Sequence, residues 1–129
     1  MPQAVCFAEV LKNAGYQNTI IKAADITFTN AHIFSLTHGY NEAMGVTEIL
    51  ADVPAERSSY IGTFEGVKDK VLLNFAKQKL ASFNKDKPFM LTLFSLDTHT
   101  PGYFYDNTCS REFRDLRDIF MCSDKTISE

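Results

Sequence analysis

The sequence predicts an α/β domain with a mainly parallel sheet, and three patterns support this. An amphipathic segment over Ala4–Asn13 is followed by a β-branched run within Tyr16–Ala24, and a helix that leads into a strand is the basic unit of an α/β fold. Residues 65–83 carry the clearest helical period of the chain. The next segment, Phe89–Leu96, is almost continuously apolar, which is typical of a parallel strand covered on both faces.

Residues that favour helix ends bound the first two helices. Pro2 lies near the start of the first helix and Gly15 lies just past its end. Asn30 is placed to cap a second helix that ends near Thr37 and is followed by Gly39. Its expected buried positions are Ile33, Phe34 and Leu36.

The rest of the chain gives a less regular pattern. Asn41–Ser59 shows no period and is interpreted as a loop-rich crossing. The helix over residues 65–83 has one apolar stripe, and the lysines on its other side are expected to face solvent: Lys68, Lys70, Lys77 and Lys79. A loop over Asp97–Ser110 precedes a last helix, expected from Arg111 toward Glu129.

Composition excludes several classes of protein. The chain has 129 residues, 45% of them hydrophobic and 22% charged, which is the balance of one soluble globular domain. A net charge of -3 with scattered basic residues gives no nucleic-acid footprint. The longest apolar run is too short to cross a bilayer, and the first residues lack a signal-peptide pattern.

Only two strands are well supported, and a two-stranded sheet cannot cover its edges. Residues 1–129 are therefore expected to form a single incomplete domain. Either the chain continues, or the open sheet edge pairs with a second copy.

The three cysteines show no CxxC spacing, so a zinc or redox motif is not indicated. Cys109 and Cys122 can form a disulfide, which fits an oxidising compartment. Free buried thiols are an equal alternative.

The sharpest functional signal is the segment that follows the last strand, Asp97-Thr98-His99-Thr100-Pro101. Ligands of open α/β sheets bind outside the carboxyl ends of the strands. A His held there can donate a hydrogen bond to a phosphate or sulfate oxygen, or protonate a leaving group. Thr98, beside His99, and Asp97 are expected to contact the substrate as well, and Asp97 can also orient His99. A loop His with a purely structural hydrogen bond is the alternative.

Other polar residues have weaker signals. Asp25 follows a strand and can approach the same site, although Asp is also an ordinary turn residue. His38 is interpreted as a structural cap at a helix end. His32 is expected on a helix surface, with a position that points to the site as the alternative. Asp69 is expected on the solvated or capping side of its helix.

Several segments that together cover nearly the whole chain occur in a particular order and spacing. These segments are AEVLKNAGYQNTIIKAAD, FTNAHIFSLTHGYNEAMG, IGTFEGVKDKVLLNFAKQKL, KPFMLTLFSLDTHTP, CSREF and MCSDKTISE. In their order and spacing they resemble the sulfatase and alkaline-phosphatase-like superfamily, closest to its bacterial phosphoglycerol transferase branch, whose members act on membrane-derived oligosaccharides and lipoteichoic acid.

This resemblance implies an internal part of a three-layer α/β/α catalytic domain. It also implies phosphate- or sulfate-ester chemistry with a divalent metal (Mn, Mg, Ca or Zn), a Thr, Ser or Cys-derived nucleophile and substrate contacts around His99. The family's nucleophile would precede the matched region and its Asp-His metal pair would follow it. The chain alone is therefore expected to be inactive and to bind no metal. The parent is expected to be anchored in the inner membrane with a periplasmic catalytic domain and a lipid-headgroup or glycan substrate.

Two other functions stay open on the residues alone. One is a non-enzymatic α/β module that uses the His99 loop to bind an anion. The other is a dimerising domain without a site, which the incomplete sheet would explain.

Overall fold

The structure is a computed structural model that describes residues 4–51, 53, 63–99 and 116–128. Its helices and strands alternate along the chain as an α/β fold requires. They are α1 (Phe7–Asn13), β1 (Gln17–Lys22), η1 (Phe28–Asn30), α2 (Ala31–Thr37), β2 (Glu42–Met44), α3 (Val46–Ile49), η3 (Thr63–Glu65), α4 (Asp69–Ser82), β3 (Phe89–Phe94) and α5 (Leu116–Ser128).

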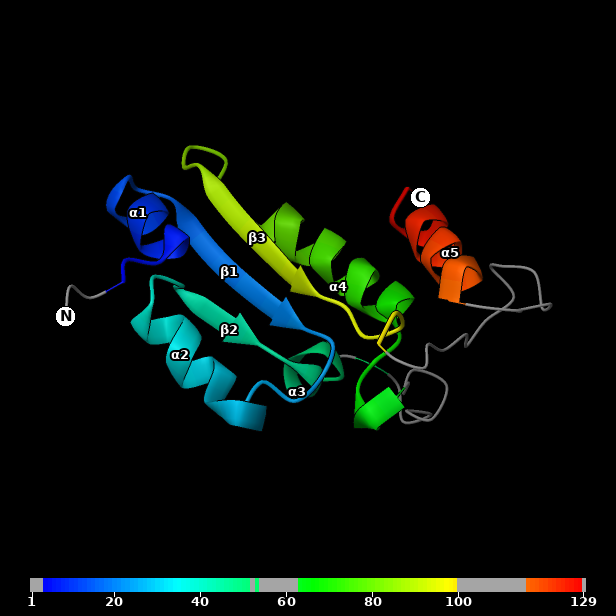
Figure 1. Cartoon of the computed structure of the whole chain (residues 1–129). Helices are drawn as coiled ribbons and strands as arrows, with labels where there is room; N and C mark the ends of the chain where they lie inside the picture. Colours follow the sequence, from blue (N-terminus) through cyan, green and yellow to red (C-terminus); the bar gives the residue numbers. More distant parts are fainter. Residues whose placement is uncertain (1–3, 52, 54–62, 100–115, 129) are drawn as a thin grey trace.

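The three described strands form one parallel sheet in the order β2-β1-β3 (Figure 1). Thr19 of β1 pairs with Glu42 of β2 on one side and with Leu91 of β3 on the other. The predicted α/β class with a parallel sheet is therefore confirmed. The prediction of an irregular crossing over Asn41–Ser59 is wrong at its start, because this segment supplies β2 and α3. A strand of three residues is too short to show an alternating pattern.

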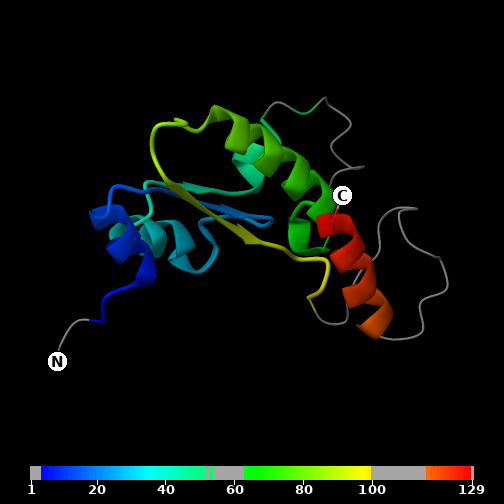
Figure 2. The same ribbon diagram turned by 90° about the horizontal axis from the view of Figure 1, so that it is seen from above.

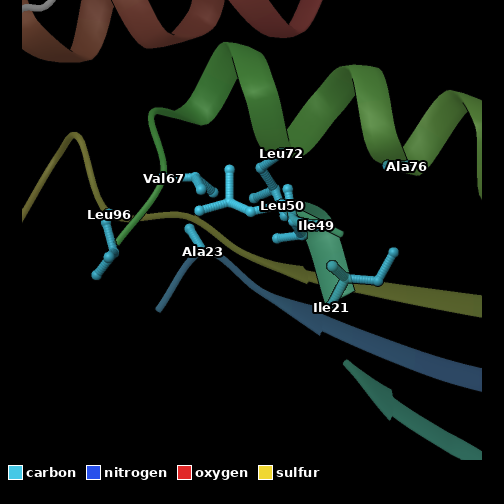
Figure 3. Close-up of a cluster of buried hydrophobic side chains, with 8 residues drawn as sticks. All are labelled: Ile21, Ala23, Ile49, Leu50, Val67, Leu72, Ala76 and Leu96. Carbon is cyan, nitrogen blue, oxygen red and sulfur yellow. The ribbon is translucent and has the colours of Figure 1, made fainter. Parts of the chain in front are cut away.

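Helices lie on both faces of the sheet (Figure 2). α3 and α4 cover one face, and α1 and α2 lie against the other. The hydrophobic core is between the sheet and α3 and α4 (Figure 3). It consists of Ile21, Ala23, Ile49, Leu50, Val67, Leu72, Ala76 and Leu96. Burial of this apolar surface is the main force that holds α4 on the sheet.

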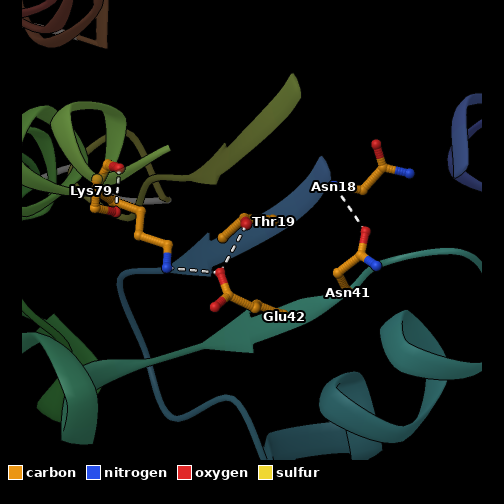
Figure 4. A network of polar contacts seen from close by, with 6 residues as sticks. Asn18, Thr19, Asn41, Glu42 and Lys79 are labelled. Carbon is orange, nitrogen blue, oxygen red and sulfur yellow. Dashed lines mark hydrogen bonds and ion pairs between the residues drawn. The ribbon is translucent and has the colours of Figure 1, made fainter. Parts of the chain in front are cut away.

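A polar network on β1 fixes the register of the sheet (Figure 4). The Thr19 hydroxyl donates to Glu42 Oε2 at 3.0 Å, and Lys79 Nζ lies 2.7 Å from the same oxygen. Lys79 is therefore not on the solvated face predicted for it. Its side chain is only 17% exposed, because it reaches from α4 back to the sheet.

The opposite face of β1 holds α1 and the turn before β2. The buried Asn18 side chain donates to the carbonyls of Ala8 (2.7 Å) and Gly39 (2.9 Å). Gly39 has φ +99, and a Cβ there would collide with the backbone of Ala8 and Glu9. A glycine is thus required where α2 ends and the chain turns back to the sheet.

Apolar periodicity overestimated the burial of two segments. Ile33, Phe34 and Leu36 of α2 are 53%, 58% and 47% exposed, and Ser35 is the buried residue of that helix. Phe89 and Phe94 of β3 are 47% and 54% exposed, so the expected burial on both faces is wrong for the ends of this strand. Within the described ranges, nothing covers these side chains fully.

Helix boundaries also differ from the predicted ones. α4 begins at Asp69 rather than near residue 65, because the Val67 N–H donates to the Ala23 carbonyl at 2.6 Å and so extends the edge of β1. Asn30 precedes α2 in a left-handed conformation and makes no side-chain cap.

The last helix, α5, packs against α4. No helix in the described part of the chain is long and apolar enough to span a membrane.

Candidate functional site

The carboxyl ends of the three strands meet at one edge of the sheet, as the parallel order requires (Figure 1). Backbone hydrogen bonds join the segments that leave this edge. The Ala23 N–H donates to the Phe94 carbonyl at 2.9 Å, and the Val46 N–H donates to the Ala24 carbonyl at 3.2 Å. With the bond from Val67 to Ala23, four segments are held together where α/β folds bind ligands.

His99 lies at this edge, in the turn that follows β3. Its N–H donates to the Leu96 carbonyl at 2.9 Å, and its side chain is exposed. The imidazole packs against the ring of Phe64 in an edge-to-face arrangement, with centroids 4.8 Å apart and planes at 70°. The strand-end rule thus predicted the location of His99. Thr100 and Pro101 lie outside the described residues.

Phe64 is a residue of the candidate site that no sequence pattern predicted. It and Glu65 have φ values of 53° and 56°, which are rare for residues with a Cβ and carry a conformational cost. This strained pair places the Phe64 ring beside His99, while the next two residues return to the sheet edge. No local pattern marks such a contact, because the two rings are far apart in the sequence.

Asp97 and Asp69 form a reciprocal pair between the β3 turn and α4. Asp69 Oδ1 accepts the Leu96 N–H at 2.8 Å and the Asp97 N–H at 3.3 Å. Asp97 Oδ2 accepts the Asp69 N–H at 3.1 Å, which satisfies a free donor of the first turn of α4. The prediction that Asp69 is on the solvated side of its helix is wrong, since it is 5% exposed.

Burial raises the pKa of Asp69, although its bonds from Leu96 and Asp97 act in the opposite direction. One oxygen of Asp97 is used inside the fold. Its role in orienting His99 or binding substrate stays a prediction. Thr98, between Asp97 and His99 in the sequence, is half-buried.

Asp25 follows β1 at the same edge of the sheet. Its Oδ1 accepts the Thr27 N–H at 2.7 Å and the Thr27 hydroxyl at 2.8 Å, and these bonds lower the pKa of Asp25. The residue is exposed, as an Asp in an ordinary turn would be. The structure therefore places it at the edge but holds one of its oxygens in a turn.

Lys22 is a second residue of the candidate site that was not predicted from the sequence. It is the last residue of β1, and its Nζ lies 5.1 Å from the centre of the Phe28 ring and 5.9 Å from that of Phe94. Its position at the end of a strand was a usable signal. It adds an ammonium group to the edge that carries His99.

The two other His residues differ in their surroundings. The His38 ring stacks on Phe34, and its Nδ1 lies 2.8 Å from the Phe34 carbonyl, so the predicted cap at the end of α2 is confirmed. His32 is half-buried rather than on the open helix surface. Its Nδ1 is buried and has no hydrogen-bond partner among the described residues.

A divalent metal is implied by the sequence resemblance. In the part of the chain that the structure describes, no group of three His, Cys, Asp or Glu side chains is placed to hold a metal ion. These residues alone do not fit such a metal, and no chemical step is assigned to one here. Cys122 is disulfide-bonded and Cys6 is free. Cys109 lies outside the described residues.

Comparison with known proteins identifies the family. The sulfatase family model matches residues 1–125, so the chain belongs to the sulfatase family. Phosphoglycerol transferase I of Citrobacter koseri is 30% identical over 99% of the chain, which corresponds to 17% of that protein. Phosphoglycerol transferase I of Salmonella arizonae is 32% identical over 86% of the chain and 14% of its own length. The chain thus spans about a sixth of the length of these relatives.

A solved structure supports the fold. A protein of the alkaline phosphatase superfamily from Vibrio parahaemolyticus matches with a TM-score of 0.70 at 22% identity. The match covers 93% of this chain and 29% of the other. The alkaline-phosphatase-like α/β architecture predicted from the sequence is therefore confirmed.

Proposed function

We propose that this chain forms part of the catalytic domain of an enzyme that transfers or hydrolyses a phosphate or sulfate ester, with phosphoglycerol or phosphoethanolamine transfer as the preferred reaction. The observation that carries the proposal is the exposed His99 imidazole at the carboxyl edge of a parallel sheet in a sulfatase-family chain. The similarity to two proteins named phosphoglycerol transferase I supports the choice of substrate.

The groups at this edge suit the parts of a phosphoglycerol ester. The His99 imidazole and the Lys22 ammonium can donate hydrogen bonds to the negatively charged oxygens of the ester. The Thr98 hydroxyl can donate as well. The carboxylates of Asp25 and Asp97 would repel those oxygens, and we assign them to substrate hydroxyl groups or to orienting His99 instead.

The contact with Phe64 gives His99 a defined role. The Phe64 ring beside the imidazole limits the orientations of the His side chain, and pre-ordering reduces the entropic cost of binding. The role assigned to His99 is that of a substrate-oxygen ligand. We assign the nucleophile and the divalent metal (Mn, Mg, Ca or Zn) to parts of the enzyme other than the described residues.

The same proposal covers the location of the parent enzyme. A disulfide at Cys122 supports an oxidising, extracytoplasmic compartment. We therefore propose a periplasmic catalytic domain on a parent anchored in the inner membrane, with a lipid headgroup or a glycan as substrate. Nucleic acid is not an expected partner, in line with the net charge of -3.

Calorimetric titration with glycerol 1-phosphate tests the role of His99. We expect His99→Ala to weaken binding by about tenfold or more, because a hydrogen bond to a charged oxygen is lost. His38→Ala is the matched control, since this His is engaged at the end of α2, and its affinity should equal that of wild type. Equal binding by wild type and His99→Ala would show that His99 is not the ligand.

Turnover assays separate the enzyme fragment from other functions. We expect the 129-residue chain with added Mn²⁺ to show no hydrolysis of a generic phosphate ester. Hydrolysis that disappears in His99→Ala would overturn this expectation. Titration with inorganic phosphate and sulfate addresses the anion-binding module: binding of these anions as tight as that of glycerol 1-phosphate would favour it, because a general anion site gains nothing from the glycerol group.

The third function, a dimerising domain, follows from the sheet edges. On their outer sides, β2 and β3 have no partner strand among the described residues, and an open edge can pair with another chain. Sedimentation equilibrium decides this point. A strictly monomeric chain would count against pairing through the sheet edge.

A further inference from the structure

One buried carboxylate controls the turn that carries His99. Asp69 lies in the first turn of α4 and is 5% exposed. Its Oδ1 accepts the N–H groups of both Leu96 and Asp97, and Asp97 returns a bond to the Asp69 N–H. We call this set of three bonds the Asp69–Asp97 clasp. It joins α4 to the segment that leaves β3.

The clasp determines the direction in which the turn leaves the sheet. Leu96 is held at three points: its side chain is in the core, its N–H is bound by Asp69, and its carbonyl accepts the N–H of His99. The backbone of His99 therefore depends on the position of Leu96. Loss of the Asp69 carboxylate would release Leu96 and Asp97 together.

The choice of Asp at this position is costly for folding alone. Asp69 Oδ2 is buried and has no hydrogen-bond partner among the described residues. Burial of a charged group without full compensation destabilises a fold. An Asn could accept the same two N–H groups, but it would bury an amide nitrogen without a hydrogen-bond acceptor in the place of Oδ2. Local violations of packing and polar rules concentrate at functional sites, and this one lies directly behind the candidate ligand site.

We propose that Asp69 is a positioning residue, which holds the His99 turn in the orientation needed to contact the ester oxygens. This inference rests on the proposed ligand role of His99. Asp69 acts through the backbone of Leu96 and Asp97 and does not itself contact the substrate. The bond from the Asp69 N–H to Asp97 Oδ2 has the same effect, because it ties the residue two positions before His99 to α4.

The test compares three variants with the wild-type chain. Asp69→Ala removes both acceptors, whereas Asp69→Asn keeps one oxygen that can accept the Leu96 N–H. Asp69→Glu keeps the charge but displaces the oxygens by one methylene, and it replaces Asp69→Ala if that variant does not fold. Asp124→Ala, at an exposed position on α5, is the matched acidic control.

Two readouts are measured on each variant. The first is the NMR position of the His99 ring protons, which the adjacent Phe64 ring shifts without any ligand. The second is the dissociation constant for glycerol 1-phosphate. We expect Asp69→Ala, or Asp69→Glu in its place, to move the ring signals and weaken binding by about tenfold. Asp69→Asn should rescue both, and Asp124→Ala should change neither.

The outcomes separate this inference from the proposed function. Unchanged His99 ring signals in folded Asp69→Ala or Asp69→Glu would overturn the positioning role, whatever the ligand does. Wild-type chain that fails to bind glycerol 1-phosphate would overturn the ligand role of His99. In that case, moved ring signals in Asp69→Ala would still show that Asp69 positions the turn.

Discussion

Replacement of Leu72 by Ala probes the packing of α4 on the sheet, on which the whole site depends. Leu72 is 1% exposed and lies in the core with Ile21 and Val67 (Figure 3). The lost transfer free energy is about 2.4 kcal/mol for three buried carbons, and the residual cavity raises the total to roughly 3–5 kcal/mol. Since domains of this size have about 5–15 kcal/mol of stability, the variant should lose a large part of it.

Urea unfolding followed by circular dichroism measures this loss. Leu80→Ala is the matched control, because Leu80 is on the same helix but is 41% exposed. We expect its loss to be under about 1 kcal/mol. Equal losses of stability in the two variants would contradict the orientation of α4, in which Leu72 faces the sheet and Leu80 faces away from it. The positions of Asp69 and Lys79 relative to the sheet would then also be wrong.

Two further predictions concern the fold around β1. Gly39→Ala should destabilise the chain by about 2 kcal/mol or more in the same urea assay, because it combines a positive φ with a collision against the start of α1; an unchanged midpoint would contradict the close approach at this turn. The hydrogen bonds from Lys79 and Thr19 lower the pKa of Glu42 in the folded chain. The ionised carboxylate therefore stabilises the fold fully above the ordinary Glu pKa of 4.5. This stabilisation is lost as the pH falls through the lowered pKa of the folded state. In the same urea assay, the free energy of unfolding of wild type should exceed that of Glu42→Gln by about 0.2–1 kcal/mol at pH 7, and this difference should disappear in acid. A difference that does not depend on pH would contradict the ion pair.

Much of the architecture followed from the sequence because its periodic segments are long. The apolar stripe of α4 and the apolar run of β3 predicted the type of each element correctly. β2 was missed, since three residues carry no period. The exposure of Phe34 and Phe94 could not be predicted either. Periodicity shows which side chains share a face, but not what covers that face.

The candidate site, like the fold, could be predicted only in part from the sequence. The rule for carboxyl ends of parallel strands placed His99 correctly, because it needs only the end of one strand. The contact of Phe64 with His99 and the clasp between Asp69 and Asp97 join residues that are distant in the sequence. No pattern within one segment records such contacts. Asp69 in particular has the sequence signature of an ordinary helix start, although it is buried.

The central claim is that phosphate esters bind at the carboxyl edge of the sheet, and an amide chemical-shift titration with glycerol 1-phosphate tests it most directly. The largest shifts should occur in residues 23–26, 64–67 and 95–99, which the structure brings together at that edge. Residues at the opposite edge, where Gln17 bonds to Pro88, should change little. Shifts that are largest at this opposite edge or on α5 would contradict the account.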